Sequence, residues 1–186
     1  LAAATAFGTG IATTAEPDAA TPEEVVSKVW AASRFLNEKG ASGFAAFNSK
    51  DGPWVWKDSY VFVYDCRLDR MVAHPMRPDL VGRPLMQITD NNGKFIFKEL
   101  CKAGEDPHGG WVEYLWTKPG AGGVSRKVSY TKAADIAFSS GIQVAAGVYD
   151  ANPLVNSTYY TISPYVVADG VTSYGAGFSF NAATAV

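Results

Sequence analysis

The chain has 186 residues, of which 47% are hydrophobic, 13% aromatic and only 18% charged, so it can bury a core and is not an intrinsically disordered chain. Its formal net charge of −2 excludes the strongly basic surface that binds nucleic acid or an anionic membrane. No run of about eighteen apolar residues occurs, so no transmembrane segment is predicted.

The first segment, residues 1–20, is almost uncharged and rich in small residues. Its only charged side chains are Glu16 and Asp18, whereas all sixteen Lys and Arg lie within residues 28–132. Residues 1–15 resemble the apolar part of a secretory signal, although they lack a basic start. We therefore predict an exported protein, extracellular or periplasmic, in which residues 1–20 form an N-terminal arm.

The central domain, residues 21–150, is predicted to begin with a helix. Thr21 is a good capping residue, Pro22 suits the first helical position, and Glu24 completes a capping box. Apolar residues then recur at helical spacing as far as Leu36. The pattern predicts one long helix, or two abutting helices, starting near Thr21.

The rest of the central domain is predicted to be mostly β-structure. A short helix is expected over residues 95–102. Aromatic and β-branched residues gather in five strand-like runs, at 60–64, 71–74, 111–116, 124–132 and 142–149. A long helix followed by strands that do not alternate with helices predicts an α+β domain around one antiparallel sheet.

These runs, in this order, resemble the single Cache domain, an extracytoplasmic PAS-like sensory family, over about residues 25–150. The resemblance implies a long N-terminal helix packed on a sheet of about five antiparallel strands. This sequence differs from the family pattern in the turn at residues 65–70, which lacks the usual glycine, and no effector module follows in it. The resemblance rests on the segments DSYVFVYD (58–65), MVAHP (71–75), LVGRPL (80–85), ITDNNGKFIFKEL (88–100), GGWVEYLW (109–116), KVSY (127–130) and GVYD (147–150).

Proteins of this family hold a small ligand, often a short carboxylate or amine, over the sheet. The resemblance implies that a corresponding site here contains Tyr60, His74, Trp111, Tyr114, Trp116, Lys127 and Tyr130. Lys127 would supply positive charge, hydroxyl and imidazole groups would donate hydrogen bonds, and indole rings would exclude water. By strand parity only one of the two tryptophans is expected to line the site. The alternative is that the aromatic residues are ordinary core residues.

The remaining reactive residues predict no catalytic centre. Cys66 and Cys101 lack metal-ligand spacing, and the sequence leaves open whether they form a disulfide or two separate buried thiols. Neither His74 nor His108 stands in a nucleophile–base pattern. We expect a protein that is not an enzyme and that uses no cofactor or metal.

The last segment, residues 151–186, is predicted to be a β-rich C-terminal arm. Its only charged residue is Asp169, and Asn156 begins a triplet that fits an N-glycosylation acceptor. Uncharged strand edges favour pairing with other strands. We therefore expect the arms to join subunits into a homo-oligomer or polymer by strand addition, with arms folded onto their own domain as the alternative.

Two functions fit these patterns. The first is an exported, non-catalytic Cache-domain protein that self-assembles through its arms as a subunit of an extracellular assembly or filament, with a pocket for a small carboxylate-like ligand. The second is a free-standing extracytoplasmic binding or sensor module for such a ligand, which acts through a separate partner.

Overall fold

A long helix opens the domain, and the sequence determines where it starts and ends. In the computed structural model, α1 (Pro22–Lys39) begins at the predicted capping box. The Thr21 hydroxyl accepts a hydrogen bond from the Glu24 N–H (3.3 Å), and the Glu24 carboxylate accepts one from the Thr21 N–H (2.9 Å). Gly40, at a left-handed φ of 59°, ends α1, and the 3₁₀ helix η1 (Gly40–Asn48) follows.

The main sheet has five strands in the order β4-β3-β7-β6-β5. All neighbouring pairs in it are antiparallel, so the predicted α+β architecture, a long helix on a PAS-like antiparallel sheet, is confirmed. The strands are β3 (Phe62–Asp65), β4 (Arg70–Ala73), β5 (Gly110–Thr117), β6 (Val124–Ala133) and β7 (Ile142–Tyr149).

The run predicted as a single strand over residues 60–64 is divided in the structure. A separate hairpin, β1 (Val55–Trp56) with β2 (Ser59–Tyr60), takes up the start of this run, and the main-sheet strand begins only at Phe62. The cause is local pairing, because the Val61 N–H donates to the Trp54 carbonyl (2.9 Å). Tyr60 is therefore held by the hairpin at the edge of the sheet.

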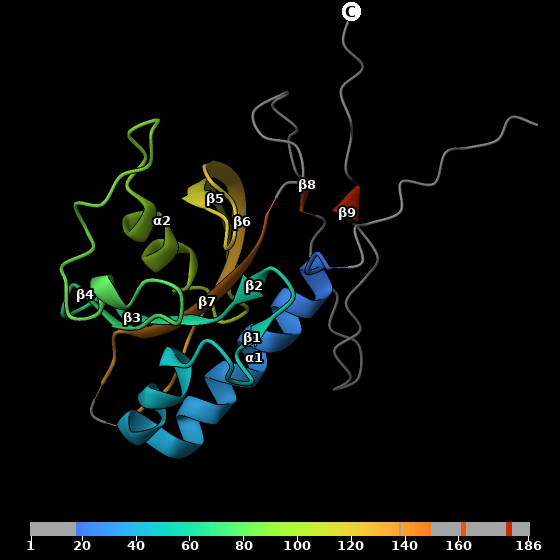
Figure 1. Ribbon diagram of the computed structural model, residues 1–186. Coiled ribbons are helices and arrows are strands. Elements are labelled where there is room, and N and C mark those ends of the chain that lie inside the picture. Colours follow the sequence, from blue (N-terminus) through green and yellow to red (C-terminus); the bar gives the residue numbers. More distant parts are fainter. Residues whose placement is uncertain (1–17, 138, 150–160, 163–177, 180–186) are drawn as a thin grey trace, which may run out of the picture.

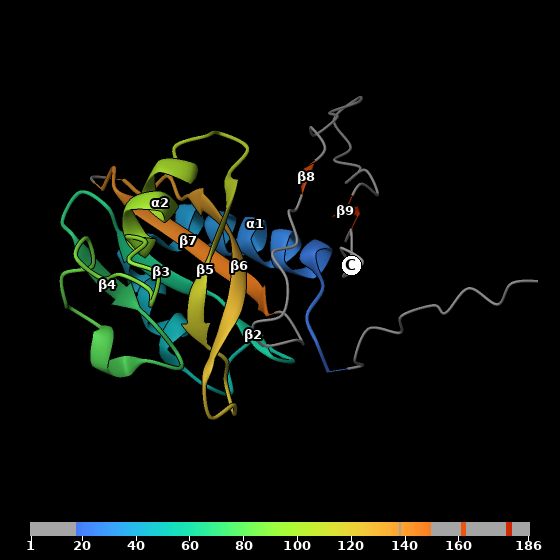
Figure 2. The ribbon, with the colours of Figure 1, turned by 90° about the horizontal axis from the view of Figure 1, so that it is seen from above.

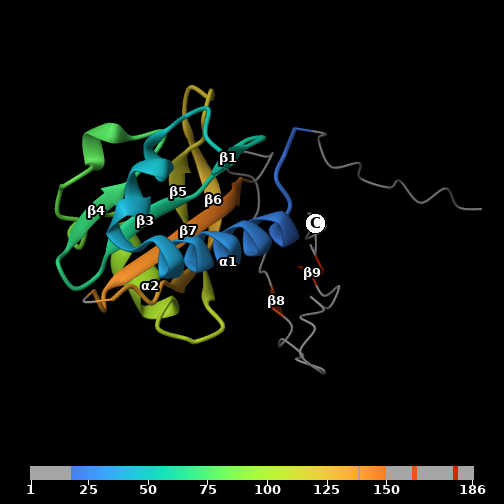
Figure 3. The same ribbon diagram turned by 90° about the horizontal axis from the view of Figure 1, so that it is seen from below.

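Different parts of the chain cover the two faces of the sheet. Figure 1 shows α1 and η1 on one side and α2 (Ile96–Ala103) on the other, and Figures 2 and 3 show the same two layers from above and below. Apolar residues of α1 pack with Val63 and Val144, whereas α2 packs with Phe62 and Tyr64. A further short 3₁₀ helix, η2 (Pro78–Leu80), follows β4.

A disulfide ties α2 to the sheet. Cys66, in the turn after β3, is bonded to Cys101 of α2, 35 residues further along the chain. The sequence leaves open whether these cysteines form a disulfide or two separate buried thiols, and the structure contains the disulfide. The bond fixes the helix that covers the face of the sheet opposite α1.

The structure describes residues 18–137, 139–149, 161–162 and 178–179. Within them, none of the helices has the length and hydropathy that a membrane span requires. Two short strands in the C-terminal segment, β8 (Thr161–Ile162) and β9 (Phe178–Ser179), pair antiparallel with each other. The N-terminal arm up to residue 17, the rest of the predicted C-terminal arm and the acceptor residue Asn156 lie outside the described residues.

Candidate functional site

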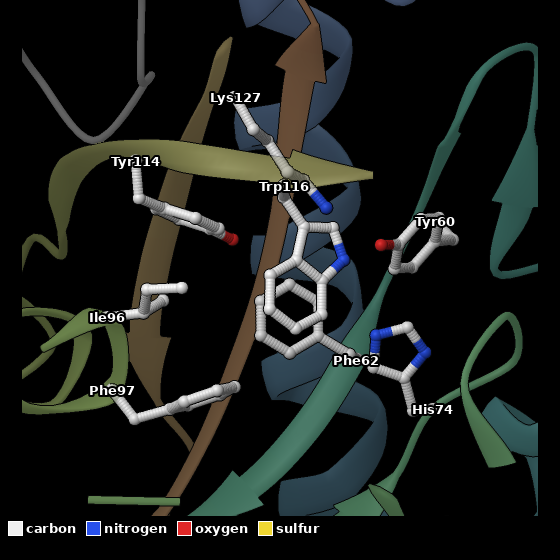
Figure 4. A pocket seen from close by; sticks show the side chains of 8 residues that line it. All are labelled: Tyr60, Phe62, His74, Ile96, Phe97, Tyr114, Trp116 and Lys127. Atoms are coloured by element: carbon white, nitrogen blue, oxygen red, sulfur yellow. The ribbon is translucent and has the colours of Figure 1, made fainter. Parts of the chain in front are cut away.

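A small pocket lies on the face of the sheet that α2 covers. We call it the inner pocket, and Figure 4 shows its lining side chains, which come from β2, β3, β5, β6, α2 and the segment after β4. Its free volume of about 10 Å³ has room for roughly one water molecule. The pocket is lined by Tyr60, Phe62, His74, Ile96, Phe97, Tyr114, Trp116 and Lys127.

Most of the residues predicted for a ligand site meet in this pocket, but Trp111 and Tyr130 do not. Both pack instead with the cluster on the α1 side of the sheet, where their rings are 5.2 Å apart. The structure therefore places them outside the inner pocket, and for Trp111 this agrees with the expectation that only one of the two tryptophans lines the site. Each is an odd number of positions away from the pocket residues of its own strand, Tyr114 in β5 and Lys127 in β6, so its side chain leaves the opposite face.

The prediction also omitted residues that line the pocket. Phe62 has the same strand parity as Tyr60, and this period-two spacing is a sequence signal that could have identified it. Ile96 and Phe97 come from α2, whose apolar face is visible in the sequence. The sequence does not say against which face of the sheet that helix packs, so their position could not be derived.

Lys127 is the main charge of the pocket. Its side chain is only 1% exposed, and within the described residues no carboxylate lies at ion-pairing distance from its ammonium group. The ammonium nitrogen lies over three aromatic rings instead, 4.1 Å from the centre of Tyr60, 4.9 Å from Tyr149 and 5.2 Å from Phe62. Ring faces attract a cation, but they do not replace a counter-ion.

Burial lowers the pKa of Lys127, because a charged ammonium group is poorly solvated among apolar rings. The Tyr60 hydroxyl opposes this lowering of the pKa most, through its electrostatic interaction and a side-chain hydrogen bond with Lys127. The Asp58 carboxylate opposes it less, and it is already ion-paired with Lys118 at 3.0 Å. An anion that reached the ammonium group would therefore gain a strong, charge-assisted hydrogen bond and would relieve an uncompensated buried charge.

His74 contributes a neutral imidazole. Its Nδ1 accepts hydrogen bonds from the backbone N–H groups of Met76 (3.2 Å) and Arg77 (3.0 Å), so the ring proton resides on Nε2. Burial, and then the positive charges of Lys127 and Arg77, lower the pKa of His74 to about 3. Figure 4 shows the other ring nitrogen facing the pocket, where it can donate a hydrogen bond to a ligand.

This shift makes the fold sensitive to acid, and His74→Asn is expected to reduce that sensitivity. Because the unfolded histidine titrates near 6.5 and the folded one near 3, the unfolded chain binds more protons in that window and stability falls as the pH falls through it. An asparagine keeps an acceptor for the two N–H groups but does not titrate. The slope of unfolding free energy against pH, measured by urea denaturation, should decrease by up to about 1.4 kcal/mol per pH unit between pH 6 and 4.

His108→Asn is the matched control for this experiment, because His108 is an exposed residue. The decrease in slope produced by His74→Asn should exceed any change produced by His108→Asn. An unchanged slope in His74→Asn would mean that the buried imidazole is protonated in the folded protein.

Tyrosine hydroxyls complete the polar part of the site. The Tyr114 hydroxyl is hydrogen-bonded to the Ser129 hydroxyl at 2.8 Å, and the Tyr60 hydroxyl to the Tyr149 hydroxyl at 3.2 Å. Burial raises the pKa of Tyr114 well above its ordinary value, so this hydroxyl keeps its proton. The pocket therefore combines one cation and several neutral donors with apolar walls, which suits a small anion that has an apolar part.

Comparison with known proteins identifies the family. Residues 22–152 match the family described as single Cache domain 2. The chain belongs to this family. It is thus an extracytoplasmic Cache domain, as the sequence patterns predicted, and it is homologous to the periplasmic ligand-binding domains of chemoreceptors and sensor kinases.

Two relatives, a chemotaxis protein and a sensor histidine kinase, are much longer than this chain. This Cache domain is 34% identical over 73 residues to the methyl-accepting chemotaxis protein McpP of Pseudomonas putida, an alignment that covers 39% of this chain and 13% of McpP. It is 35% identical over 82 residues to the sensor histidine kinase MctS of Rhizobium johnstonii, covering 42% of this chain and 17% of MctS. The chain therefore spans only a small part of either relative.

Solved structures with the same fold are sensory domains. A periplasmic sensor domain of a chemotaxis protein is 28% identical, with a TM-score of 0.52 over 67% of this chain and 89% of that one. A Cache chemosensory domain described for carboxylic acid recognition is 25% identical, with a TM-score of 0.51 over 67% and 85%. A chemotaxis protein of Vibrio parahaemolyticus, at 19% identity and a TM-score of 0.55 over 68% and 86%, shares the fold.

Proposed function

We propose that this Cache domain is a sensory module that binds a small carboxylate in the inner pocket and passes its bound state to a signalling partner. The observation that carries the proposal is Lys127, a fully buried ammonium group without a carboxylate partner among the described residues. The solved relative described for carboxylic acid recognition supports the same ligand class.

The chemistry of the neighbouring groups favours a carboxylate over an amine. A cationic amine would meet the positive charge of Lys127 at close range in a poorly solvated pocket, and that repulsion is costly. The inner pocket has room for only about one water molecule, so the Trp116 ring would have to move aside for a carboxylate of two or more carbons. A carboxylate bound there would accept hydrogen bonds from Lys127 and from the Nε2–H of His74, while Ile96 and Phe97 would contact its apolar end. We therefore propose Tyr60, His74, Tyr114, Trp116 and Lys127 as the ligand-binding residues.

The pocket chemistry also supports a binding role rather than catalysis. The neutral His74 imidazole is fixed by two backbone N–H groups, and the described part of the chain contains no cluster of metal-ligating side chains. Self-assembly through the arms is not part of the proposal, because nearly all of the residues concerned lie outside the described part of the chain and no contact within that part favours it.

Isothermal titration calorimetry tests this function. The purified chain is titrated with carboxylates of two to four carbons, with the corresponding primary amides and with amines of the same length. We expect heat of binding with at least one carboxylate and none with its amide, because the amide has the same shape but no charge. Binding of amines instead, or of none of these compounds, would refute the proposed ligand class.

A further inference from the structure

A second, larger hollow adjoins the inner pocket. We call it the outer basin. It has a volume of about 290 Å³, and Tyr60 and Trp116 line both hollows. These two side chains therefore separate the inner pocket from the outer basin. The inner pocket has room for about one water molecule, and the outer basin has room for a small molecule. Any ligand that reaches Lys127 from the outer basin has to pass these two side chains.

Trp116 is the less buried of the two residues that separate the inner pocket from the outer basin. It is only partly buried, whereas Tyr60 is 1% exposed and held in the β1–β2 hairpin. Figure 4 shows its indole ring lying across the middle of the inner pocket. On its other side the ring borders the outer basin, which has a volume of about 290 Å³ and could receive the ring if it swung outward.

Arg77 holds this ring from the side of the outer basin. Its guanidinium carbon lies 5.8 Å from the centre of the Trp116 ring. The guanidinium group is itself fixed by two hydrogen bonds to the Asp79 carboxylate, both 2.8 Å long. Arg77 and Asp79 lie at the surface, so the contact between the guanidinium group and the Trp116 ring is weak. A weak contact can hold the ring in place and still release it.

The outer basin has the charge that an anion would need. Its lining includes Lys50, Arg77 and Lys118 and contains no acidic side chain. Arg77 is paired with Asp79 and Lys118 with Asp58, so among the described residues Lys50 is the lining cation without a carboxylate at ion-pairing distance. A hollow lined by one sign of charge raises the local concentration of the opposite ion and speeds its association. The charge of the basin therefore matches the charge of the inner pocket.

From these observations we infer that the outer basin is the access route for the anion and that Trp116, latched by Arg77, is the gate to the inner pocket. This inference rests on the proposed function, because it assumes that the anion binds to Lys127. It adds a site in which an anion first collects, and it gives Trp116, which also lines the inner pocket, control over the rate of ligand exchange.

The gate can be tested without knowing the ligand, by the rate at which a small reagent reaches Lys127. The deprotonated amine attacks acetic anhydride, forming an amide bond and releasing acetate and a proton. Mass spectrometry of proteolytic peptides then gives the acetylation rate of Lys127 and, as an internal reference, of the exposed Lys98. We expect Trp116→Leu to accelerate acetylation of Lys127 about tenfold or more, with the Lys98 rate unchanged.

Two further variants make the experiment decisive. Trp111→Leu changes a tryptophan of the same strand on the opposite face of the sheet and should leave the Lys127 rate unchanged. Arg77→Ala removes the latch at the surface, where misfolding is not expected, and should accelerate acetylation by a smaller factor. Equal Lys127 rates in the wild type, Trp116→Leu and Arg77→Ala would overturn the gate, as would an equal acceleration by Trp111→Leu.

This result is independent of the calorimetric test of ligand class. If carboxylates bind but the acetylation rates are equal, the proposed function stands and the gate is wrong. If the rates differ as expected but no carboxylate binds, the gate stands and the proposed ligand is wrong.

Discussion

Replacing Lys127 with methionine is expected to weaken carboxylate binding by about tenfold or more and, at the same time, to stabilise the fold. The substitution removes a charge-assisted hydrogen bond to the ligand worth roughly 1.5–3 kcal/mol, which is about tenfold or more in affinity. It also replaces a buried, unpaired ammonium group by an apolar side chain of similar length among the rings of Tyr60, Phe62 and Tyr149. Burying an uncompensated charge is unfavourable, so the midpoint of urea unfolding should rise while the affinity measured by calorimetry falls.

Lys98→Met is the matched control. Lys98 also lies over an aromatic ring, with its ammonium nitrogen 3.8 Å from the centre of Phe95, but it is exposed on α2. It should leave both the affinity and the unfolding midpoint nearly unchanged. If Lys127→Met instead lowers stability by several kcal/mol, the ammonium group has a structural partner and its role as a binding group is in doubt.

Removal of the disulfide, in the double variant Cys66→Ala and Cys101→Ala, is expected to destabilise the domain by about 3–4 kcal/mol. The bond closes a loop of 35 residues, and in the chain-entropy model a loop of this length restricts the unfolded chain by about that amount. The same variant should also weaken ligand binding, because the bond holds α2, which carries Ile96 and Phe97 of the inner pocket. Urea denaturation monitored by tryptophan fluorescence measures the first effect, and calorimetry the second.

Reductant provides the control for this prediction. A dithiol reagent should lower the unfolding midpoint of the wild type towards that of the double variant and should not change the variant itself. A wild type that is equally stable with and without reductant, at full reduction of both thiols, would show that packing alone holds α2 in place.

Local patterns in the sequence were sufficient to predict most of the fold. The capping box at Thr21 located the start of α1, and runs of aromatic and β-branched residues located the strands β5, β6 and β7. These signals succeed because each depends on neighbours along the chain. The division of the run at residues 60–64 was not predicted, because it depends on pairing with Val55 in another strand, and a single sequence does not report such pairing.

The candidate site was predictable only in part, for the same reason. Tyr60, His74 and Lys127 could be named because the family resemblance carries them, and strand parity shows why Trp111 faces away from them. The closure of the pocket by Ile96 and Phe97, and its division from the outer basin by Trp116, depend on how α2 and the β5–β6 turn pack. Such tertiary contacts leave no periodic trace in the sequence.

A crystal structure of the domain grown with a short carboxylate that binds in calorimetry would test the central claim most directly. The predicted result is a carboxylate in the inner pocket, with one oxygen at hydrogen-bonding distance from the Lys127 ammonium group and an oxygen accepting from Nε2 of His74. Its apolar end should lie towards Ile96 and Phe97. A carboxylate bound only in the outer basin, or one whose apolar end faces Lys127, would contradict the account.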